Sequence, residues 1–281
     1  MTQHPTWTKI KIQPGSTKSL VSLFSQTTKT KKITTICEEA CCPNLSECWG
    51  RGTATFMLLG DVCTRGCRYC SVNKGKPEKP DENEPRNLAE TIKQMQAKYI
   101  VLTMVDRDDL KDAGAAHILE TVYEIKKTNP TTKIELLVGD LNGDTNLIQE
   151  VATAEIDVFS HNIETVERLY PKLRPQGRYQ TALKVLNTAA SLGIQTKTSL
   201  IAGMGETTEE VFSLLHDIKN AGVGIFTSGQ YLRPSQNQVP VIKHRSPSWF
   251  EMVEKKAQSM GIKSKCGPLV RSSYMAETLY K

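Results

Sequence analysis

The sequence predicts an α/β fold in which six βα units form an incomplete barrel, a partial (β/α)6 barrel. Short apolar or β-branched runs alternate with amphipathic helical patterns, which is typical of repeated βα units around a parallel sheet. Six such units can be counted, too few to close the common eight-stranded barrel. The chain has 281 residues, of which 38% are apolar and 23% charged, so it is long enough to bury a sizeable core.

The predicted strands are short runs rich in apolar and β-branched residues: Thr55–Leu59, Tyr99–Thr103, Lys133–Leu137, Asp157–His161, Gln195–Ile201 and Gly224–Ser228. Helices are predicted for the amphipathic stretches: Leu88–Lys98, Ala115–Lys127, Thr145–Ala154, Glu164–Tyr170, Thr181–Leu192 and Thr207–Ala221. The Pro-rich, charged stretch 74–85 is expected to be a connecting loop. The barrel is expected over residues 54–230, between an N-terminal arm with a cysteine motif (1–53) and a C-terminal extension (231–281).

Composition and charge narrow the class of protein. The longest apolar run, Tyr99–Val105, is far shorter than the ~18 residues of a membrane span, and no signal-peptide pattern opens the chain. We therefore expect no membrane partner and a cytoplasmic location. Residues 1–36 carry six Lys and no acid, while basic and acidic residues balance at 30 each from Cys37 onward. A solvated arm is the simplest interpretation, with an acidic partner or an organellar transit peptide as alternatives; the arm has no Arg, and we expect no nucleic-acid partner.

The cysteines carry most of the chemical information. Seven of the eight fall between positions 37 and 70. A disulfide framework spreads cysteines through a short secreted chain, so a dense group in a long chain favours metal binding instead. A structural zinc site commonly uses two C-x2-C pairs, which these spacings do not supply.

The segment GDVCTRGCRYC contains Cys63, Cys67 and Cys70 in the spacing C-x3-C-x2-C. Three thiolates can hold three irons of a 4Fe-4S cluster and leave the fourth iron open for a substrate or cofactor. A second set of three, Cys37, Cys42 and Cys48, lies upstream in CEEACCPNLSECW. The sequence therefore predicts two iron-sulfur clusters. The one on Cys63, Cys67 and Cys70, with its open iron, is predicted to be catalytic.

With an aromatic residue before its last cysteine, the C-x3-C-x2-C segment resembles the radical S-adenosylmethionine signature, in which the open iron binds that cofactor. Both cysteine segments, together with YIVLTMVDRDDLKDAGAAH, FSHNIETVERLYPKLRP, GMGETTEEV, GQYLRPS and GPLVRSSY, resemble the lipoyl synthase family along essentially the whole chain. The resemblance implies the partial barrel of radical S-adenosylmethionine enzymes, with N-terminal and C-terminal extensions that carry an auxiliary cluster.

The resemblance also implies the reaction and the partners. The first cluster, on Cys63, Cys67 and Cys70, would cleave S-adenosylmethionine to a radical that abstracts hydrogen from C6 and then C8 of a protein-bound octanoyl chain. The auxiliary 4Fe-4S cluster, on Cys37, Cys42 and Cys48 with Ser273 of RSSY as fourth ligand, would donate the sulfur. Implied partners are an octanoylated lipoyl-carrier protein or domain (2-oxoacid dehydrogenase E2 or glycine cleavage H protein), an electron donor and an iron-sulfur carrier.

Further candidates follow the predicted strands, since chemistry in parallel βα sheets collects at the carboxyl ends of strands. Asn162 and Glu164 are candidates for the ribose hydroxyls of the cofactor, with helix capping as the alternative for Asn162. Arg174 is a candidate for the cofactor carboxylate, with a surface loop position as its alternative. The stretch 199–206, SLIAGMGE, resembles a segment that lines the adenine, although Ser199 replaces its first Gly.

Several alternatives stay open. Asp109 is expected to be structural, while Asp106 and Arg107 have no assigned role, and His161 is as well explained by burial as by function. A methylthiotransferase or biotin synthase would share the C-x3-C-x2-C of Cys63, Cys67 and Cys70 but not CEEACCPNLSECW or RSSY. For the two remaining cysteines we weigh a thiol reserve, with Cys41 close to Cys266, against simple packing.

Overall fold

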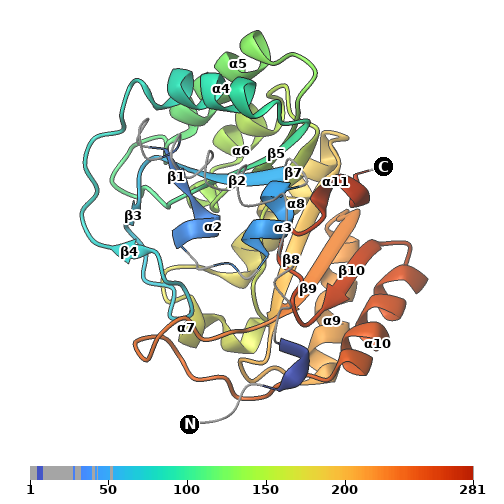
Figure 1. Ribbon diagram of the computed structural model, residues 1–281. Helices are drawn as coiled ribbons and strands as arrows, with labels where there is room; N and C mark the ends of the chain where they lie inside the picture. Colours follow the sequence, from blue (N-terminus) through green and yellow to red (C-terminus); the bar gives the residue numbers. More distant parts are fainter. Residues whose placement is uncertain are drawn as a thin grey trace.

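A curved sheet of eight strands organises the computed structural model, among the residues that it describes (5–8, 28, 33–39, 42, 44–50 and 53–280; Figure 1). Its strands are, in spatial order, β1 (Thr34–Thr35), β2 (Thr53–Leu58), β5 (Tyr99–Met104), β6 (Lys133–Leu137), β7 (Val158–Ser160), β8 (Thr196–Ala202), β9 (Ile225–Gln230) and β10 (Lys263–Gly267). A separate small sheet pairs β3 (Val62–Cys63) with β4 (Asn73–Lys74).

The six predicted strands are confirmed as β2 and β5 to β9, which pair in parallel and in sequence order. Strand β10 is a seventh parallel strand that the sequence analysis missed; it pairs with β9, with Cys266 opposite Ser228. At the other edge, β1 pairs antiparallel with β2, with Thr35 opposite Phe56. The residues expected as a C-terminal extension thus also widen the barrel sheet.

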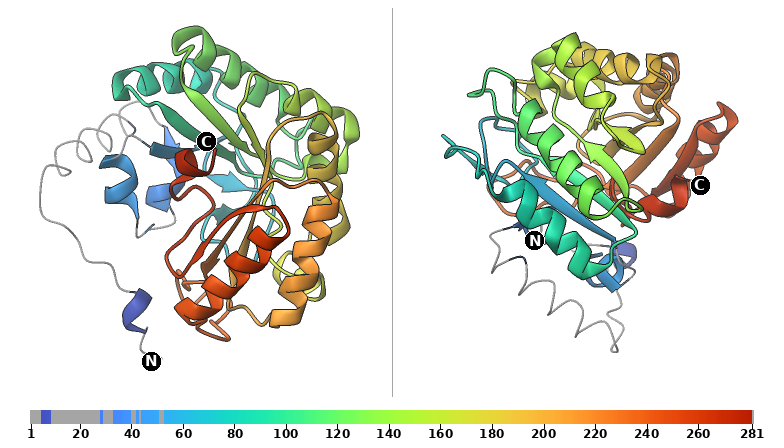
Figure 2. Two further views of the ribbon diagram at one scale, coloured as in Figure 1. Left: turned by 90° about the vertical axis from the view of Figure 1, so that its right-hand side faces the viewer. Right: turned by 90° about the horizontal axis from the view of Figure 1, so that it is seen from above.

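The longer helices cover the outer, convex face of the sheet (Figures 1 and 2). They are α4 (Glu84–Met95), α5 (Ala115–Thr128), α6 (Thr145–Ala152), α8 (Tyr179–Ser191), α9 (Thr208–Asn220) and α10 (Pro247–Ser259). Alternate strand residues, such as Ile100 and Leu102 of β5, pack against apolar helix residues such as Ile118 in the core. Burial of these faces is the main force that holds helices to sheet. The ends of α10 follow from local signals, because Ser246 caps it and Pro247 opens it.

The prediction of a helix over residues 164–170 is wrong, because the helical turns begin later in the chain. Glu164 adopts a positive φ of 64° and forms a parallel β-bridge with Leu200, so it extends the end of the sheet. A 3-10 turn, η3 (Glu167–Leu169), and the short helix α7 (Tyr170–Leu173) follow instead. This shift leaves residues 161–166 as a loop at the carboxyl end of β7.

Short elements complete the described chain: η1 (Thr6–Thr8), α2 (Ile36–Glu39), α3 (Leu45–Gly50), η2 (Leu141–Gly143) and α11 (Ala276–Leu279). After α11, the ring of Tyr280 lies 6.2 Å from that of Tyr99, and its hydroxyl donates to Asp157 at 3.1 Å. The C-terminal segment therefore packs at the amino ends of the strands. None of the helices in the described part of the chain is long and apolar enough to cross a membrane.

Candidate functional site

The first cysteine group lies in the loop that follows β2, at the carboxyl ends of the parallel strands. Cys63 ends β3, and its carbonyl accepts the amide of Gly75 at 3.1 Å, which anchors the loop to β4. The amide of Cys70 donates to the carbonyl of Cys67 at 3.2 Å, in a tight turn. All three thiols are free and half-buried. The predicted convergence of these cysteines on one loop at the strand ends is thus present.

The guanidinium of Arg65 ties this loop to the loops after β5 and β6. Its Nε and Nη2 donate to Asp108 at 2.9 and 2.7 Å, and its Nη1 donates to Asp140 at 2.7 Å. The amide of Arg65 donates to Sγ of Cys63 at 3.4 Å. Burial acts to lower the pKa of Arg65, but the hydrogen bonds to Asp108 and Asp140 outweigh it and raise the pKa. Arg65 therefore stays charged and fixes the loop from inside the cysteine motif.

Burial raises the pKa of all three thiols, that of Cys70 to about 11. The nearby Arg174 acts to lower the pKa of the Cys67 thiol. Iron ions bind the thiolate, so the clustered thiols exchange protons for metal when a cluster is bound. In the part of the chain that the structure describes, no three His, Cys, Asp or Glu side chains are arranged to hold a single metal ion. The donor set at this loop fits a multi-iron cluster with three protein ligands.

The three predicted cofactor-binding residues meet beside this loop. Arg174, at the end of α7, is 7% exposed, and its Nη1 donates to the carbonyl of Asn162 at 3.0 Å and to the hydroxyl of Tyr170 at 3.2 Å. Burial raises the pKa of Glu164, whereas Arg174 and a hydrogen bond from Asn162 act to lower it. The surface position considered for Arg174 is therefore wrong, and Asn162 caps no helix, because η3 begins only after Val166.

Buried polar atoms at these residues lack partners within the described residues: Nε of Arg174, Oδ1 of Asn162 and Nε2 of His161. A buried polar atom without a partner is costly, so a polar ligand that supplied these hydrogen bonds would bind favourably. His161 donates or accepts through Nδ1 to the carbonyl of Val138 at 2.9 Å, and burial lowers its pKa to about 4. The imidazole is thus neutral and half satisfied. These atoms fit a small polar cofactor such as S-adenosylmethionine.

The stretch 203–206 forms a hydrogen-bonded cradle after β8. The amides of Gly203, Met204 and Gly205 donate to the carboxylate of Glu206 at 2.8, 3.0 and 3.1 Å. Arg245 donates to the same carboxylate at 2.9 Å and to the backbone carbonyl of Glu206. Both side chains are buried, so this ion pair holds the turn in one shape.

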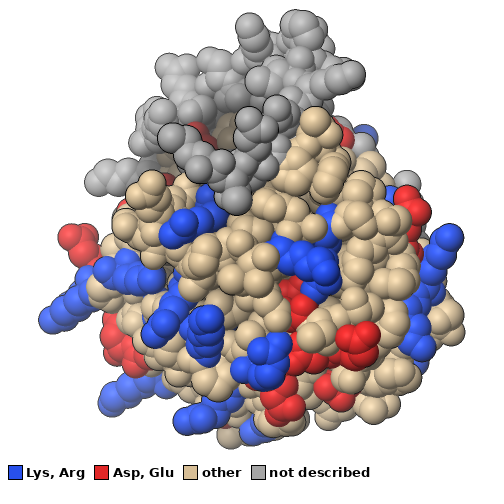
Figure 3. Space-filling view, turned by 90° about the horizontal axis from the view of Figure 1, so that it is seen from below, with Lys and Arg blue, Asp and Glu red and all other residues tan. Residues whose placement is uncertain are grey.

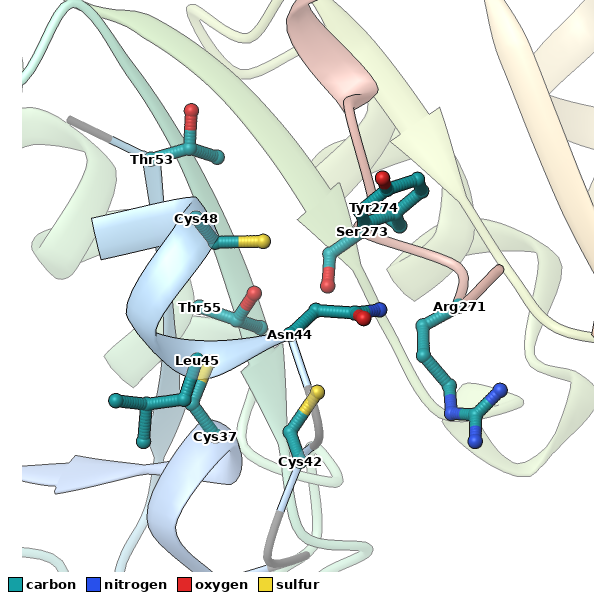
Figure 4. A pocket seen from close by; sticks show the side chains of 10 residues that line it. All are labelled: Cys37, Cys42, Asn44, Leu45, Cys48, Thr53, Thr55, Arg271, Ser273 and Tyr274. Carbon is teal, nitrogen blue, oxygen red and sulfur yellow. The ribbon is translucent and has the colours of Figure 1, made fainter. Parts of the chain in front are cut away.

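Figure 4 shows a second group of side chains, in a pocket lined by residues from both ends of the chain. The empty space, including open solvent, is about 290 Å³. Cys42 and Cys48 point toward Ser273 across this space, with Cys37 behind Leu45 (Figure 4). All four predicted ligands of the auxiliary cluster thus line one pocket: Cys37, Cys42, Cys48 and Ser273.

Three hydrogen bonds fasten the N-terminal side of this pocket to the C-terminal side. The side-chain amide of Asn44 donates to the carbonyl of Leu269 at 2.7 Å. The hydroxyl of Tyr274 donates to Glu47 at 3.2 Å, and that of Thr53 donates to Glu277 at 3.4 Å. Figure 2 shows the C-terminal segment beside α2 and α3. These contacts bring the Ser273 hydroxyl to the thiols. Residues 271–274 do form the turn that the motif alone suggests, with the amide of Tyr274 donating to the carbonyl of Arg271 at 3.0 Å, but the turn is half-buried and lines the pocket.

The pKa of Cys48 is raised to about 12, mainly by burial and also by the neighbouring Cys37 and Cys42 thiols. All three thiols line the same pocket. Three thiols and one hydroxyl supply four ligands, the number a cubane needs, and the oxygen is a harder ligand for iron than sulfur. The residues present therefore fit a 4Fe-4S cluster in which three irons are bound by thiolates and the fourth by the Ser273 oxygen.

The two other cysteines give no support to a thiol reserve. Cys41 lies outside the described residues. Cys266 lies on the helix-facing side of β10, where it packs with Phe226, Phe250 and Val253 in the core. Its buried position matches the packing alternative.

Sequence reasoning missed the side chains that hold the two loops in shape. Arg65 and Asp140 are 75 residues apart, and Arg245 and Glu206 are 39 apart, so no local pattern joins them. Arg107 is buried and donates to Asp109 at 2.9 Å, which supports the structural role expected for Asp109. The one available signal was position, since Asp106, Asp108 and Asp140 all follow predicted strands.

Comparisons with known proteins give the family of the chain. The Radical SAM superfamily model matches residues 57–218. The chain is 45% identical over its whole length to the lipoyl synthase of Caldicellulosiruptor saccharolyticus, covering 98% of that protein. It is 46% identical to the lipoyl synthase of Mannheimia succiniciproducens, with 98% of this chain and 87% of that protein covered.

Solved structures share the fold at low identity. Methylornithine synthase is 16% identical with a TM-score of 0.60, over 89% of this chain and 72% of that one. The FeFe-hydrogenase maturase HydG of Carboxydothermus hydrogenoformans is 12% identical with a TM-score of 0.56, over 95% of this chain and 83% of that one. With the superfamily model matched over more than half of the chain and lipoyl synthases matched over nearly all of it, the chain belongs to the lipoyl synthase family of radical S-adenosylmethionine enzymes.

Proposed function

We propose that the two cysteine groups divide the work of one reaction between them. The chain is a radical S-adenosylmethionine sulfurtransferase that inserts two sulfur atoms, at C6 and C8, into a protein-bound octanoyl group. It uses S-adenosylmethionine and two 4Fe-4S clusters. The observation that carries the division is the pocket of Figure 4, in which three thiols and the Ser273 hydroxyl meet from opposite ends of the chain.

In this proposal Cys63, Cys67 and Cys70 hold the cluster that binds S-adenosylmethionine, and Arg174 with Asn162 orients the cofactor. The unpartnered Nε of Arg174 and Oδ1 of Asn162 support these roles. When bound, the cluster supplies the electron that generates a 5′-deoxyadenosyl radical. Glu164, half-buried between Arg174 and Tyr69, accepts hydrogen bonds from the cofactor's hydroxyl groups.

Cys37, Cys42, Cys48 and Ser273 hold the auxiliary cluster, which supplies the inserted sulfur. Strand β2 runs between the two centres: Thr53 and Thr55 line the auxiliary pocket, and the first cysteine loop follows the strand's other end. In this proposal the end of the acyl chain that carries C6 and C8 lies beside β2, between the two centres.

The remaining partners follow from this chemistry. The octanoyl group arrives on a lipoyl-carrier protein or domain, from a 2-oxoacid dehydrogenase or the glycine cleavage system. A reducing protein supplies electrons to the first cluster, and an iron-sulfur carrier rebuilds the auxiliary one. We assign residues 1–53 and 231–281 to the auxiliary cluster and 54–230 to cofactor cleavage, while β10 also serves the barrel.

The experiment that tests the division compares Cys63→Ala with Cys48→Ala and Ser273→Ala in the anaerobic holoenzyme. Cys63→Ala should form no 5′-deoxyadenosine, because the open iron is lost with its cluster. Cys48→Ala and Ser273→Ala should still form 5′-deoxyadenosine but make less than about one-tenth of the lipoyl product, since their centre supplies only sulfur. Both products are measured by mass spectrometry.

Cys266→Ala is the matched control, because this buried cysteine lies in the core and in neither group. It should retain both activities. Formation of 5′-deoxyadenosine by Cys63→Ala, or full lipoyl formation by Cys48→Ala, would show that the assignment of the groups is wrong.

A further inference from the structure

Three segments around the first cysteine loop contain basic residues and no acidic ones. They are residues 62–77, 168–178 and 231–246, which together hold eleven Lys and Arg. From Cys37 onward the chain as a whole has equal numbers of basic and acidic residues. The three segments therefore depart strongly from the charge balance of the chain.

Backbone and side-chain hydrogen bonds show that these segments are neighbours. The amide of Arg68 donates to the carbonyl of Leu173 at 2.9 Å, and the amide of Val239 donates to the carbonyl of Arg68 at 3.0 Å. The side chain of Gln238 donates to the carbonyl of Cys70 at 3.1 Å. The three acid-free segments thus form one surface around the loop of Cys63, Cys67 and Cys70.

Some basic side chains of these segments are already neutralised. Arg65 is paired with Asp108 and Asp140, and Arg168 binds Glu210 at 2.6 Å. The others that are exposed or half-buried, and that bind no acidic side chain among the described residues, include the set that we name the basic rim: Arg68, Lys74, Lys76, Lys172 and Arg233. Figure 3, which looks at the side where α7 and the chain after β9 lie, shows Lys and Arg side chains spread over this face, with a group of Asp and Glu side chains in its lower part.

We propose that the basic rim is the docking surface for an acidic face of the octanoylated carrier domain, an inference that rests on the proposed function. Excess positive charge at a site mouth attracts a negatively charged partner and raises its association rate. In this proposal the acyl arm enters beside the first centre, because Arg68, Lys74 and Lys76 of the rim lie on the loop that carries Cys67 and Cys70. A carrier held there presents its arm to the centre.

A nucleic acid fits this surface less well. Binding of single strands uses exposed aromatic side chains between the basic ones. Among the described residues of the three segments, Tyr170 and Tyr231 are buried, and Tyr69 is packed against the core. The basic rim therefore offers positive charge but no exposed aromatic side chain on which a base could stack.

The test is charge reversal of the three rim lysines, Lys74→Glu, Lys76→Glu and Lys172→Glu together. Their side chains are exposed, and none of them is a proposed cluster ligand. Turnover is measured with two substrates, the full octanoylated carrier domain and a short neutral octanoyl-lysyl peptide, with dithionite as reductant. We expect KM for the carrier domain to rise about tenfold at low salt and the difference to shrink at high salt, with kcat unchanged. KM for the peptide should not change.

The matched control reverses three exposed lysines outside the three segments: Lys98→Glu, Lys219→Glu and Lys255→Glu. This variant has the same net charge and should keep the parent KM for the carrier. Equal KM values in the rim and control variants would overturn the proposal. It would also be overturned if the rim variant were impaired only when an acidic electron-transfer protein replaced dithionite, or only in binding a labelled oligonucleotide. Failure of the proposed function would look different, because the parent would then convert neither substrate.

Discussion

A buried ion pair lies among the sheet residues that face away from the covering helices. Nζ of Lys197 in β8 lies 2.8 Å from Oε2 of Glu135 in β6, and each side chain is about 1% exposed. The hydroxyl of Tyr99 donates to the same carboxylate oxygen at 2.9 Å. Burial raises the pKa of Tyr99, and the Glu135 charge raises it further, so the phenol stays protonated. The carboxylate therefore depends on two fixed donors.

Lys197→Met should lower the free energy of unfolding by about 3–5 kcal/mol, because it leaves the Glu135 carboxylate buried without its counter-charge. Adding Glu135→Gln should recover most of that loss, since the buried charge is removed as well. Anaerobic urea unfolding of the holoenzyme measures both variants. A Lys197→Met protein as stable as the parent would mean that water or another group already solvates Glu135.

At the scale of a single element, β9 is where the C-terminal segment crosses closest to the sheet. A Cβ atom on Gly229 would overlap the backbone carbonyl of Val270. Backbone cannot move aside as a flexible side chain can, so this close approach requires glycine. Val270 lies three residues before Ser273. The close approach of Val270 to Gly229 therefore fixes how far Ser273 and its side of the auxiliary pocket lie from the sheet.

Gly229→Ala should displace the segment around Val270, reduce lipoyl formation at least tenfold and leave formation of 5′-deoxyadenosine within twofold of the parent. The matched control is Gly267→Ala, whose added Cβ would meet only a side-chain methyl of Val270, at 3.2 Å. That methyl can shift, so the control should keep both activities. Equal behaviour of the two variants would contradict the role given to the crossing.

The elements also show which features a sequence can predict. Strands such as β5 are buried on both faces and read as uninterrupted apolar runs, so their positions were evident. Strand β10 alternates exposed Lys263 and Lys265 with buried Ser264 and Cys266 at the edge of the sheet, and no apolar run marks it. Glu164 was misread because its left-handed backbone and its bridge to Leu200 depend on a strand far along the chain.

The same distinction holds for the site. Cysteine spacing is local, so both groups of cysteines could be recognised in the sequence as candidate ligands. The partners of Arg65 and Arg245 are distant in sequence, and only the fold joins them. Ser273 was predictable solely through family resemblance, because one serine in RSSY carries no chemical signature of its own.

At the scale of the whole molecule, the two ends of the chain are fastened together at the auxiliary pocket. Asn44 and Leu269 are joined across 225 residues, and Glu47 and Tyr274 across 227. The C-terminal segment also packs Ala276 and Tyr280 against Tyr99 and Val101. Residues 271–274 are therefore one wall of the pocket.

A chain truncated after Pro268 should lose about half of its iron to a chelator many times faster than the other half, because the wall with Ser273 is missing while the first cysteine loop is intact. Iron release is followed by the absorbance of the chelate. Tyr274→Phe is the milder control, since it removes only the hydroxyl that binds Glu47. Uniform slow release from the truncated chain would show that three thiols suffice.

The joined ends have a consequence for the order of events during synthesis. At roughly 5–20 residues per second, a ribosome takes about 11–45 s to travel from Asn44 to Leu269, which are 225 residues apart. Cys63, Cys67 and Cys70 are translated early in that interval, and for the rest of it the auxiliary pocket still lacks its second wall. The auxiliary pocket therefore takes shape only after the segment that carries Ser273 has been made, long after the cysteines of the other loop.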